Sequence, residues 1–219
     1  ARESFHDVYG DLNNIPSAII YNGAPDKLFN SKCKQSPTLR NSFIVAGRAS
    51  PRKRIVNTVY NFAKSPFSKH FNLLVAGEHN PLYLNIHPNV HYLGKLRPDK
   101  LQHYLAGCRG LLHLDWYDWC PNLIVEALAN CTPVLCGSIG GSPEIVKCSG
   151  LIYNFSDPVP DFNSIPLEIP IISQNKFNDA LSMFIDFTSA SSINPRKDLA
   201  ISYIAKQYSE FISYNFPLR

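Results

Sequence analysis

The chain has 219 residues, which is enough for one large domain or two small ones. With 45% hydrophobic and 12% aromatic residues it can bury a real core, so wholesale disorder is excluded. The net charge of +4 suits an anionic small ligand or a membrane surface, but there is no clustered basic stripe of the kind that nucleic-acid binding uses. No run approaches the length of a transmembrane helix, and no signal peptide is visible.

Apolar runs bounded by turn residues predict strands and helices in alternation along most of the chain. Strands are expected at residues 17–20, 43–46, 71–76, 90–94, 111–114 and 133–136. Helices are expected weakly at 1–10, then at 53–63, 98–106, 122–130, from 143 onward, at 177–187 and at 198–212. The proline-rich residues 156–173 are expected to be irregular. This order predicts an α/β fold, a Rossmann-like parallel sheet with flanking helices.

Two basic residues follow the strand at 43–46 and point to an anion site. Gly47 and Arg48 end the strand, and Lys53 opens the next predicted helix. A helix amino terminus favours an anion by about 0.3–1 kcal/mol, whereas a charge-assisted hydrogen bond contributes roughly 1.5–3 kcal/mol. The two basic side chains should therefore dominate the binding of a diphosphate. Arg52 and Arg54 are expected to be solvated.

An acidic residue stands among apolar neighbours in the helix predicted at 122–130. Glu126 lies within the run Leu-Ile-Val-Glu-Ala-Leu, and a buried carboxylate without a partner would be costly. A vicinal diol, such as that of a ribose, would satisfy both oxygens. The alternative is that Glu126 lies on one solvated stripe of a buried helix. His113, on the preceding strand, is open to two similar interpretations, a residue near the ligand or a core histidine.

Cysteine and histidine spacing gives no sign of a metal or cofactor site. The six cysteines form no C-x-x-C pair, and none of the seven histidines has metal-ligand spacing. Four cysteines lie in apolar strand or helix contexts, where a free thiol behaves as a small hydrophobe. We therefore expect no metal and no cofactor, and a reducing, cytoplasmic setting.

The motifs between residues 118 and 144 resemble a known family. Asp118 precedes Glu126 by eight positions, and the chain continues with Glu126-Ala127-Leu128-Ala129, Pro133-Val134 and Gly140-Gly141-Ser142-Pro143-Glu144. This order is similar to the donor-binding half of retaining GT-B glycosyltransferases of the glycogen synthase and sucrose synthase type. Two departures are that Asp118 replaces the usual Glu and Cys131 replaces a glycine.

The resemblance implies roles for these residues in binding a nucleoside-diphosphate sugar, the donor substrate. Arg48 and Lys53 would neutralise the diphosphate without a metal ion, Asp118 would position donor-sugar hydroxyls, and Glu126 would bind the ribose. The remaining donor-site residues would be Gly47, Asn122, Gly140, Gly141 and Ser142. The acceptor would be a glycan or a lipid-linked hydroxyl. A GT-B sugar epimerase or phosphorylase, and a nucleotide-binding regulatory module without activity, remain alternatives.

The resemblance also implies a domain order. Tyr21-Asn22-Gly23 is similar to the family's interdomain linker, although two residues instead of one separate Gly23 from Asp26. Residues 1–21 would be the tail of an acceptor domain and 22–30 the linker. Residues 31–195 would form the nucleotide-sugar-binding domain and 196–219 a C-terminal helix. An acceptor-binding domain would then precede the chain, and the chain alone should be inactive.

Overall fold

Six parallel strands form the central sheet of the computed structural model, which describes residues 16–30, 36–48, 50–78, 86–160 and 168–216. Their order across the sheet is β3-β2-β1-β4-β5-β6. The strands are β1 (Ser42–Ala46), β2 (Asn72–Ala76), β3 (Val90–Gly94), β4 (Gly110–His113), β5 (Val134–Gly137) and β6 (Gly150–Tyr153). The fold class is that predicted from the sequence.

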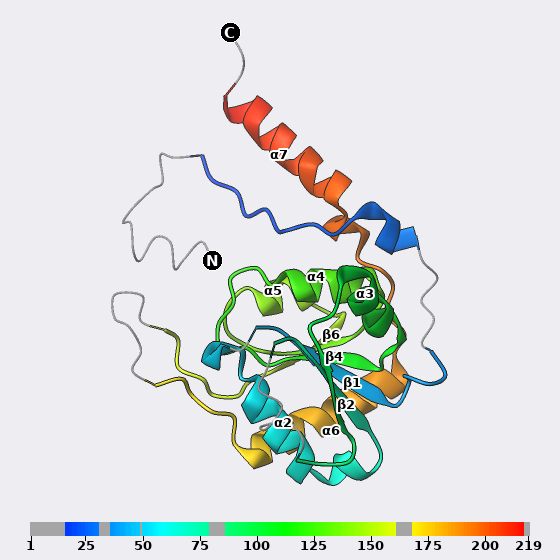
Figure 1. The fold of residues 1–219 in the computed structure, drawn as a ribbon. Coiled ribbons are helices and arrows are strands. Elements are labelled where there is room, and N and C mark those ends of the chain that lie inside the picture. The colour runs from blue at the N-terminus through cyan, green and yellow to red at the C-terminus, as the bar shows by residue number, and fades with distance from the viewer. Residues whose placement is uncertain (1–15, 31–35, 49, 79–85, 161–167, 217–219) are drawn as a thin grey trace.

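Helices cover both faces of the sheet (Figure 1). The helices are α2 (Ile55–Lys64), α3 (Pro98–Gly107), α4 (Asn122–Ala129), α5 (Ser142–Val146), α6 (Gln174–Ala190) and α7 (Ile201–Asn215). On one face α4 packs between α3 and α5, and on the other α2 packs on α6. Helix α7 projects away from the sheet.

Strand β1 contributes side chains to two separate cores. Phe43 and Val45 of β1 belong to the cluster beneath α2 and α6, whereas Ile44 belongs to the cluster beneath α3, α4 and α5. Side chains alternate across a strand, and a sheet covered on both faces needs apolar residues at every position. This is why the strands appear in the sequence as short continuous apolar runs.

The strand order places a crevice between β1 and β4. From β1 the chain proceeds outward through β2 to β3, and it then returns to pair β4 with the other side of β1. Ligands of open α/β sheets bind where the direction of winding reverses, outside the carboxyl ends of the strands. The loop after β1 (residues 47–54, the β1 loop) and the loop after β4 (residues 114–121, the β4 loop) meet there.

Three sequence predictions about elements are wrong, and one strand was missed. Residues 17–20 form no strand. Helix α2 begins at Ile55, because Lys53 ends a 3-10 turn (Pro51–Lys53) and Arg54 then adopts a left-handed conformation with φ 49°. A further 3-10 turn, Lys197–Leu199, precedes α7. Strand β6 was missed because its apolar run has only three residues, between Gly150 and Asn154. The segment at 1–10 lies outside the described residues.

The N-terminal segment is fastened to the start of α7. The Ala24 amide donates to the Leu199 carbonyl, and the Ile201 amide donates to the Ala24 carbonyl, each at 2.9 Å. Of the residues in α7, Ile204 is buried. No helix in the described ranges is long and apolar enough to cross a membrane. Among the described residues, Cys108, Cys120, Cys136 and Cys148 are free thiols.

Candidate functional site

The β1 loop and the β4 loop form a cleft at the carboxyl edge of the sheet. The backbone amide of Trp116 donates to the carbonyl of Arg52 at 2.9 Å, which ties the two loops together. The cleft has a volume of about 540 Å³. It is lined by Arg48, Ser50, Arg52, Lys53, Tyr117, Asp118 and Trp119. The sequence predictions Arg48, Lys53 and Asp118 are therefore brought together in one place.

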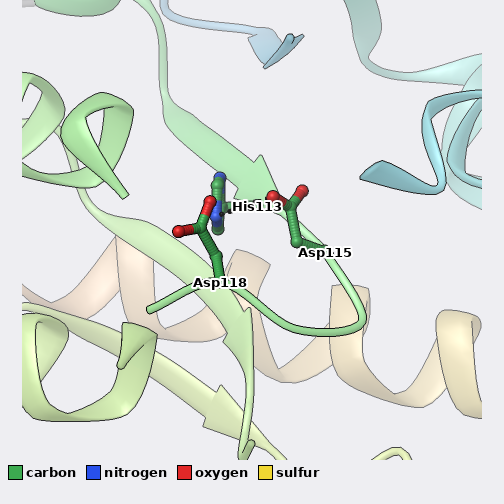
Figure 2. A group of neighbouring side chains, drawn as sticks. All are labelled: His113, Asp115 and Asp118. Atoms are coloured by element: carbon green, nitrogen blue, oxygen red, sulfur yellow. Dashed lines mark ion pairs between the residues drawn. The ribbon is translucent and has the colours of Figure 1, made fainter. Parts of the chain in front are cut away.

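Lys53 is held between two carboxylates in this cleft. Its ammonium donates to Asp118 Oδ2 at 2.7 Å and also to Asp115 Oδ2. Figure 2 shows His113 at the end of β4 beside Asp115 and Asp118. His113 Nε2 lies 3.3 Å from Asp115 Oδ2, but its alignment does not make a hydrogen bond. We call these four residues the acid–lysine cluster.

Burial and charge act in opposite directions on the acid–lysine cluster. Burial lowers the pKa of Lys53, but the Asp115 and Asp118 carboxylates outweigh it, and the net pKa is raised. Burial is the largest effect on His113 and lowers the pKa of its imidazole below the ordinary 6.5. At neutral pH the cluster therefore contains an ammonium ion and a neutral imidazole.

The same residues include the ligand types that a divalent cation prefers. His113, Asp115 and Asp118 each offer a ligand atom, and these atoms lie within 4.8 Å of one another. The Lys53 ammonium, however, donates to both carboxylates and occupies the space between them. A metal ion would therefore have to displace Lys53 to bind here.

The glycine-rich loop packs directly against the β4 loop. The Gly141 amide donates to the Asp118 carbonyl at 2.8 Å. A Cβ added at Gly141 would lie 1.7 Å from the Trp119 carbonyl oxygen, so only glycine fits this approach. Gly140 has a left-handed φ of 83°, and Ser142 is buried at the start of α5. The predicted residues Gly140, Gly141 and Ser142 thus adjoin Asp118.

Glu126 and Asn122 of α4 line a second, smaller hollow of about 350 Å³. Gln102 donates to Glu126 Oε2 at 2.5 Å, and burial raises the pKa of the Glu126 carboxyl. Glu126 is half-buried, so it is neither wholly enclosed by apolar groups nor on a fully solvated stripe. Residues 22–25 line the same hollow, where Asn22 Nδ2 donates to Asn122 Oδ1 at 2.7 Å.

Comparison with known proteins decides the family. Residues 26–154 match the family model described as glycosyl transferases group 1, which is more than half of the chain. The chain belongs to this family. Among proteins of curated function, none matches the sequence.

Solved structures of glycosyltransferases share the fold of this group 1 glycosyltransferase chain. WaaB, a lipopolysaccharide outer core galactosyltransferase in its apo form, superposes with a TM-score of 0.71 at 14% identity, over 98% of this chain and 60% of WaaB. HepE from Anabaena, in complex with UDP and glucose, gives 0.70 at 18% identity, over 97% and 60%. Sucrose-phosphate synthase from Thermosynechococcus elongatus gives 0.66 at 18% identity, over 98% and 56%.

These matches extend over only part of each partner. The chain spans about 60% of the length of WaaB and of HepE. At identities below 20% the structures establish the shared GT-B half-fold and not the substrate. The glycosyltransferase family assignment therefore comes from the sequence match and the parallel sheet from the structure.

Two residues of this glycosyltransferase chain escaped the sequence analysis. Asp115 contacts Lys53, but no role was predicted for it from the sequence. Arg54 was predicted to be solvated, which is wrong. It is buried and paired with Asp157. Arg54 has a left-handed backbone, and its partner Asp157 is 103 residues away in the sequence. No local sequence pattern could therefore predict the burial of Arg54.

Proposed function

We propose that this chain is the donor-binding half of a retaining glycosyltransferase that uses a nucleoside-diphosphate sugar. It would transfer a hexosyl group to a hydroxyl of a glycan or lipid-linked acceptor. The observation that carries the proposal is the cleft where the winding of the sheet reverses. Three cationic side chains, those of Arg48, Arg52 and Lys53, line it together with a carboxylate. The HepE structures in complex with UDP and with UDP-glucose support a nucleotide sugar as the donor.

The proposed donor diphosphate competes with the carboxylates for Lys53. Arg48 is exposed on the cleft and can meet the diphosphate directly. Lys53 donates to Asp115 and Asp118 before the donor arrives. When the diphosphate recruits the ammonium, Asp118 Oδ2 loses its donor and can accept a hydrogen bond from a sugar hydroxyl. Binding of the leaving group and positioning of the sugar would thus be coupled through one lysine.

The proposed chemistry needs no metal ion. A departing diphosphate requires positive charge, which bound cations supply in many phosphoryl and glycosyl transfers. Arg48 and Lys53 supply that charge here. The Lys53 ammonium also lies between the carboxylates that would otherwise attract a cation. Both residues would stabilise the charge that develops as the bond to the sugar breaks.

Glu126, Asn122 and the glycine-rich loop complete the proposed donor site. Glu126 Oε2 accepts from Gln102 but the carboxylate also faces the hollow beside the linker. A ribose diol in that hollow would be its partner. The amides around Gly140, Gly141 and Ser142 would line the sugar, because this loop lies on the Asp118 backbone.

An acceptor-binding domain is the proposed partner. Helix α7 exposes large apolar side chains, and the chain spans about 60% of the glycosyltransferases it resembles. The exposed side chains on α7 are Ile201, Tyr203, Tyr208, Ile212 and Tyr214. A preceding domain, linked through residues 22–30, would cover this face. The domain order predicted from the sequence is part of this proposal.

One observation favours a second candidate, a nucleotide-binding module without transferase activity. Two carboxylates surround the one lysine of the cluster, which weakens its pull on an anion. Nucleotide binding alone would be consistent with the same cleft. Product formation in the presence of the acceptor half separates the two candidates.

The direct test is stabilisation by nucleoside diphosphates. At a hundredfold excess over its dissociation constant, the matching ligand should raise the free energy of unfolding by about 2.7 kcal/mol. Uridine, guanosine, adenosine and thymidine diphosphates would be compared by thermal and urea unfolding. Arg48→Ala should remove most of the effect. Lys64→Ala, on the exposed end of α2, serves as the matched control.

The same titration tests metal independence. The stabilisation should persist in the presence of a chelator. A strict requirement for magnesium or manganese would contradict the proposed role of Arg48 and Lys53, and no response to any of the four diphosphates would refute the site.

A further inference from the structure

Arg54 is buried beside the cleft, and both the burial of its charge and its backbone conformation are unfavourable in free energy. Its guanidinium makes a two-point contact with Asp157, in which Nη1 donates to Oδ2 at 2.9 Å and Nη2 donates to Oδ1 at 2.8 Å. Both side chains are nearly inaccessible to solvent, so two charges have been removed from water. The backbone of Arg54 is also left-handed, which is unfavourable for any residue with a Cβ.

The segment that carries Asp157 fastens the second loop as well. The indole N–H of Trp116 donates to the Pro158 carbonyl at 2.9 Å, and Trp116 is buried. Asp157 therefore binds Arg54, which follows Lys53 in the sequence. Pro158 binds Trp116, which follows Asp115. Ser156, immediately before them, is left-handed with φ 57°. Residues 156–158, here called the β6 exit segment, thus contact both loops of the cleft.

Unfavourable backbone and buried charge persist only where the surroundings impose them, and they gather at functional sites. Three such features lie next to the acid–lysine cluster. They are the left-handed backbones of Arg54 and Ser156 and the buried Arg54–Asp157 ion pair. The hydrogen bond from the Trp116 amide to the Arg52 carbonyl joins the two loops directly, and the β6 exit segment contacts both of them. Together these contacts restrict the movement of Lys53, which lies between Arg52 and Arg54 in the sequence.

We propose that Arg54 and Asp157 are positioning residues that fix Lys53 between Asp115 and Asp118, at the place where it meets the donor diphosphate. The two-point Arg–Asp contact sets the path of the β1 loop, and the β6 exit segment aligns the β4 loop with it. The nucleotide part of this proposal rests on the proposed function. The placement of Lys53 does not.

A double variant removes the pair without leaving a buried charge. Arg54→Gly suits the left-handed backbone, and Asp157→Asn keeps the shape of the carboxylate. Arg54→Lys is the milder variant, because lysine keeps the charge but cannot make the planar two-point contact. Arg109→Ala is the matched control. Arg109 bonds Thr188 and Ser189 at the amino end of β4, so its loss destabilises the fold away from the cleft.

The first measurement needs no nucleotide. Acetylation of Lys53 by an amine-reactive ester, followed by mass spectrometry, reports how firmly its ammonium is held, and exposed Lys64 on the same chain is the internal reference. Relative to Lys64, Lys53 should react about tenfold faster in the double variant, the effect of losing one charge-assisted hydrogen bond, and moderately faster in Arg54→Lys. Arg109→Ala should leave the ratio unchanged.

The second measurement is a double-mutant cycle on uridine diphosphate affinity. The double variant should bind about tenfold more weakly than the parent chain, but should cause no further weakening when Lys53 is already alanine. Unchanged Lys53 acetylation in folded Arg54→Lys and double variants, or equal weakening with and without Lys53, would overturn the positioning role. Faster acetylation together with no uridine diphosphate binding by the parent chain would refute the proposed function and leave the positioning role standing.

Discussion

Glu126 has a conflict between stability and the ribose-binding role proposed for it. Burial raises the pKa of its carboxyl above the ordinary 4.5, so the folded state holds the proton more tightly than the unfolded chain does. Stability from this group therefore increases as pH falls through the folded pKa towards 4.5, and at neutral pH the ionised carboxylate is a net cost. A ligand that donates two hydroxyls to the carboxylate would offset that cost.

We predict that Glu126→Gln weakens uridine diphosphate binding and leaves pyrophosphate binding nearly unchanged. At neutral pH the variant should be at least as stable as the parent chain, because it removes the ionised group. The difference in free energy of unfolding between variant and parent should decrease towards pH 4.5. Calorimetric titration and urea unfolding at several pH values measure both effects. Equal weakening of the two ligands, or a general loss of folding, would instead identify Glu126 as a structural acid.

His113 should make the fold sensitive to mild acid. Its imidazole is buried against Asp115, with Lys53 and Asp118 close by, and burial lowers its pKa below 6.5. Below pH 6.5 the imidazole of His113 is protonated in the unfolded chain but stays neutral in the folded chain. The free energy of unfolding therefore has its full value above pH 6.5 and decreases as the pH falls towards the folded pKa.

We predict that His113→Gln reduces the decrease in free energy of unfolding that acid causes. Glutamine is similar in volume and does not titrate, so the free energy of unfolding should vary less with pH below 6.5. Exposed His70→Gln is the control and should keep the slope of the parent chain. A slope that survives in His113→Gln would assign the acid sensitivity to other groups.

The glycine-rich loop and the β4 loop act as one unit because their backbones touch. The Gly141 amide bonds the Asp118 carbonyl, and no side chain fits between Gly141 and the Trp119 carbonyl. A methyl group at Gly141 must push the two loops apart, and Asp118 would move with its backbone. The position of the proposed catalytic carboxylate thus depends on a residue that never contacts substrate through a side chain.

We predict that Gly141→Ala weakens nucleotide-sugar binding more than nucleoside diphosphate binding. The reason is that Asp118, which we propose faces the sugar, would be displaced, while Arg48 and Lys53 on the β1 loop would be affected less. Gly137→Ala is the matched control, because a Cβ there meets its nearest neighbour, Phe155, at an ordinary 3.7 Å. Equal weakening of both ligands in a Gly141→Ala variant that still folds would contradict the argument.

How far the sequence predicts these elements depends on the range of the interactions involved. Strands β1 to β5 and helices α3 and α4 are set by local apolar runs, and the sequence predicts them to within one or two residues. The start of α2 was misplaced because Arg54 breaks the helix through a contact with Asp157, which is far away in sequence. Arg48 and Lys53 reach the cleft as expected, since the strand that precedes them fixes where the β1 loop lies.

At the scale of the whole chain, we propose that it forms one half of a two-part enzyme. The proposed donor cleft lies at the carboxyl edge of the sheet, and the proposed linker meets the chain just before α7, where Ala24 pairs with Ala200. The exposed apolar side chains of α7, among them Tyr208 and Ile212, would be covered only by another domain or chain. The sequence predicts this division through the linker motif, but no local pattern could predict how much of α7 stays exposed.

We predict that the isolated chain binds the donor but transfers sugar very slowly. Transfer needs donor and acceptor held together, and positioning of this kind can supply roughly 7–11 kcal/mol of the barrier reduction. Without a facing domain, the cleft beside Asp118 stays open to water, so slow hydrolysis of the donor is the expected side reaction. Time-resolved product formation with matched donor and acceptor measures both reactions. Adding the acceptor half, in the same chain or as a separate partner, should restore transfer. Robust transfer by the isolated chain would mean that it holds the acceptor itself, and that α7 and the linker end a complete enzyme instead of joining two halves.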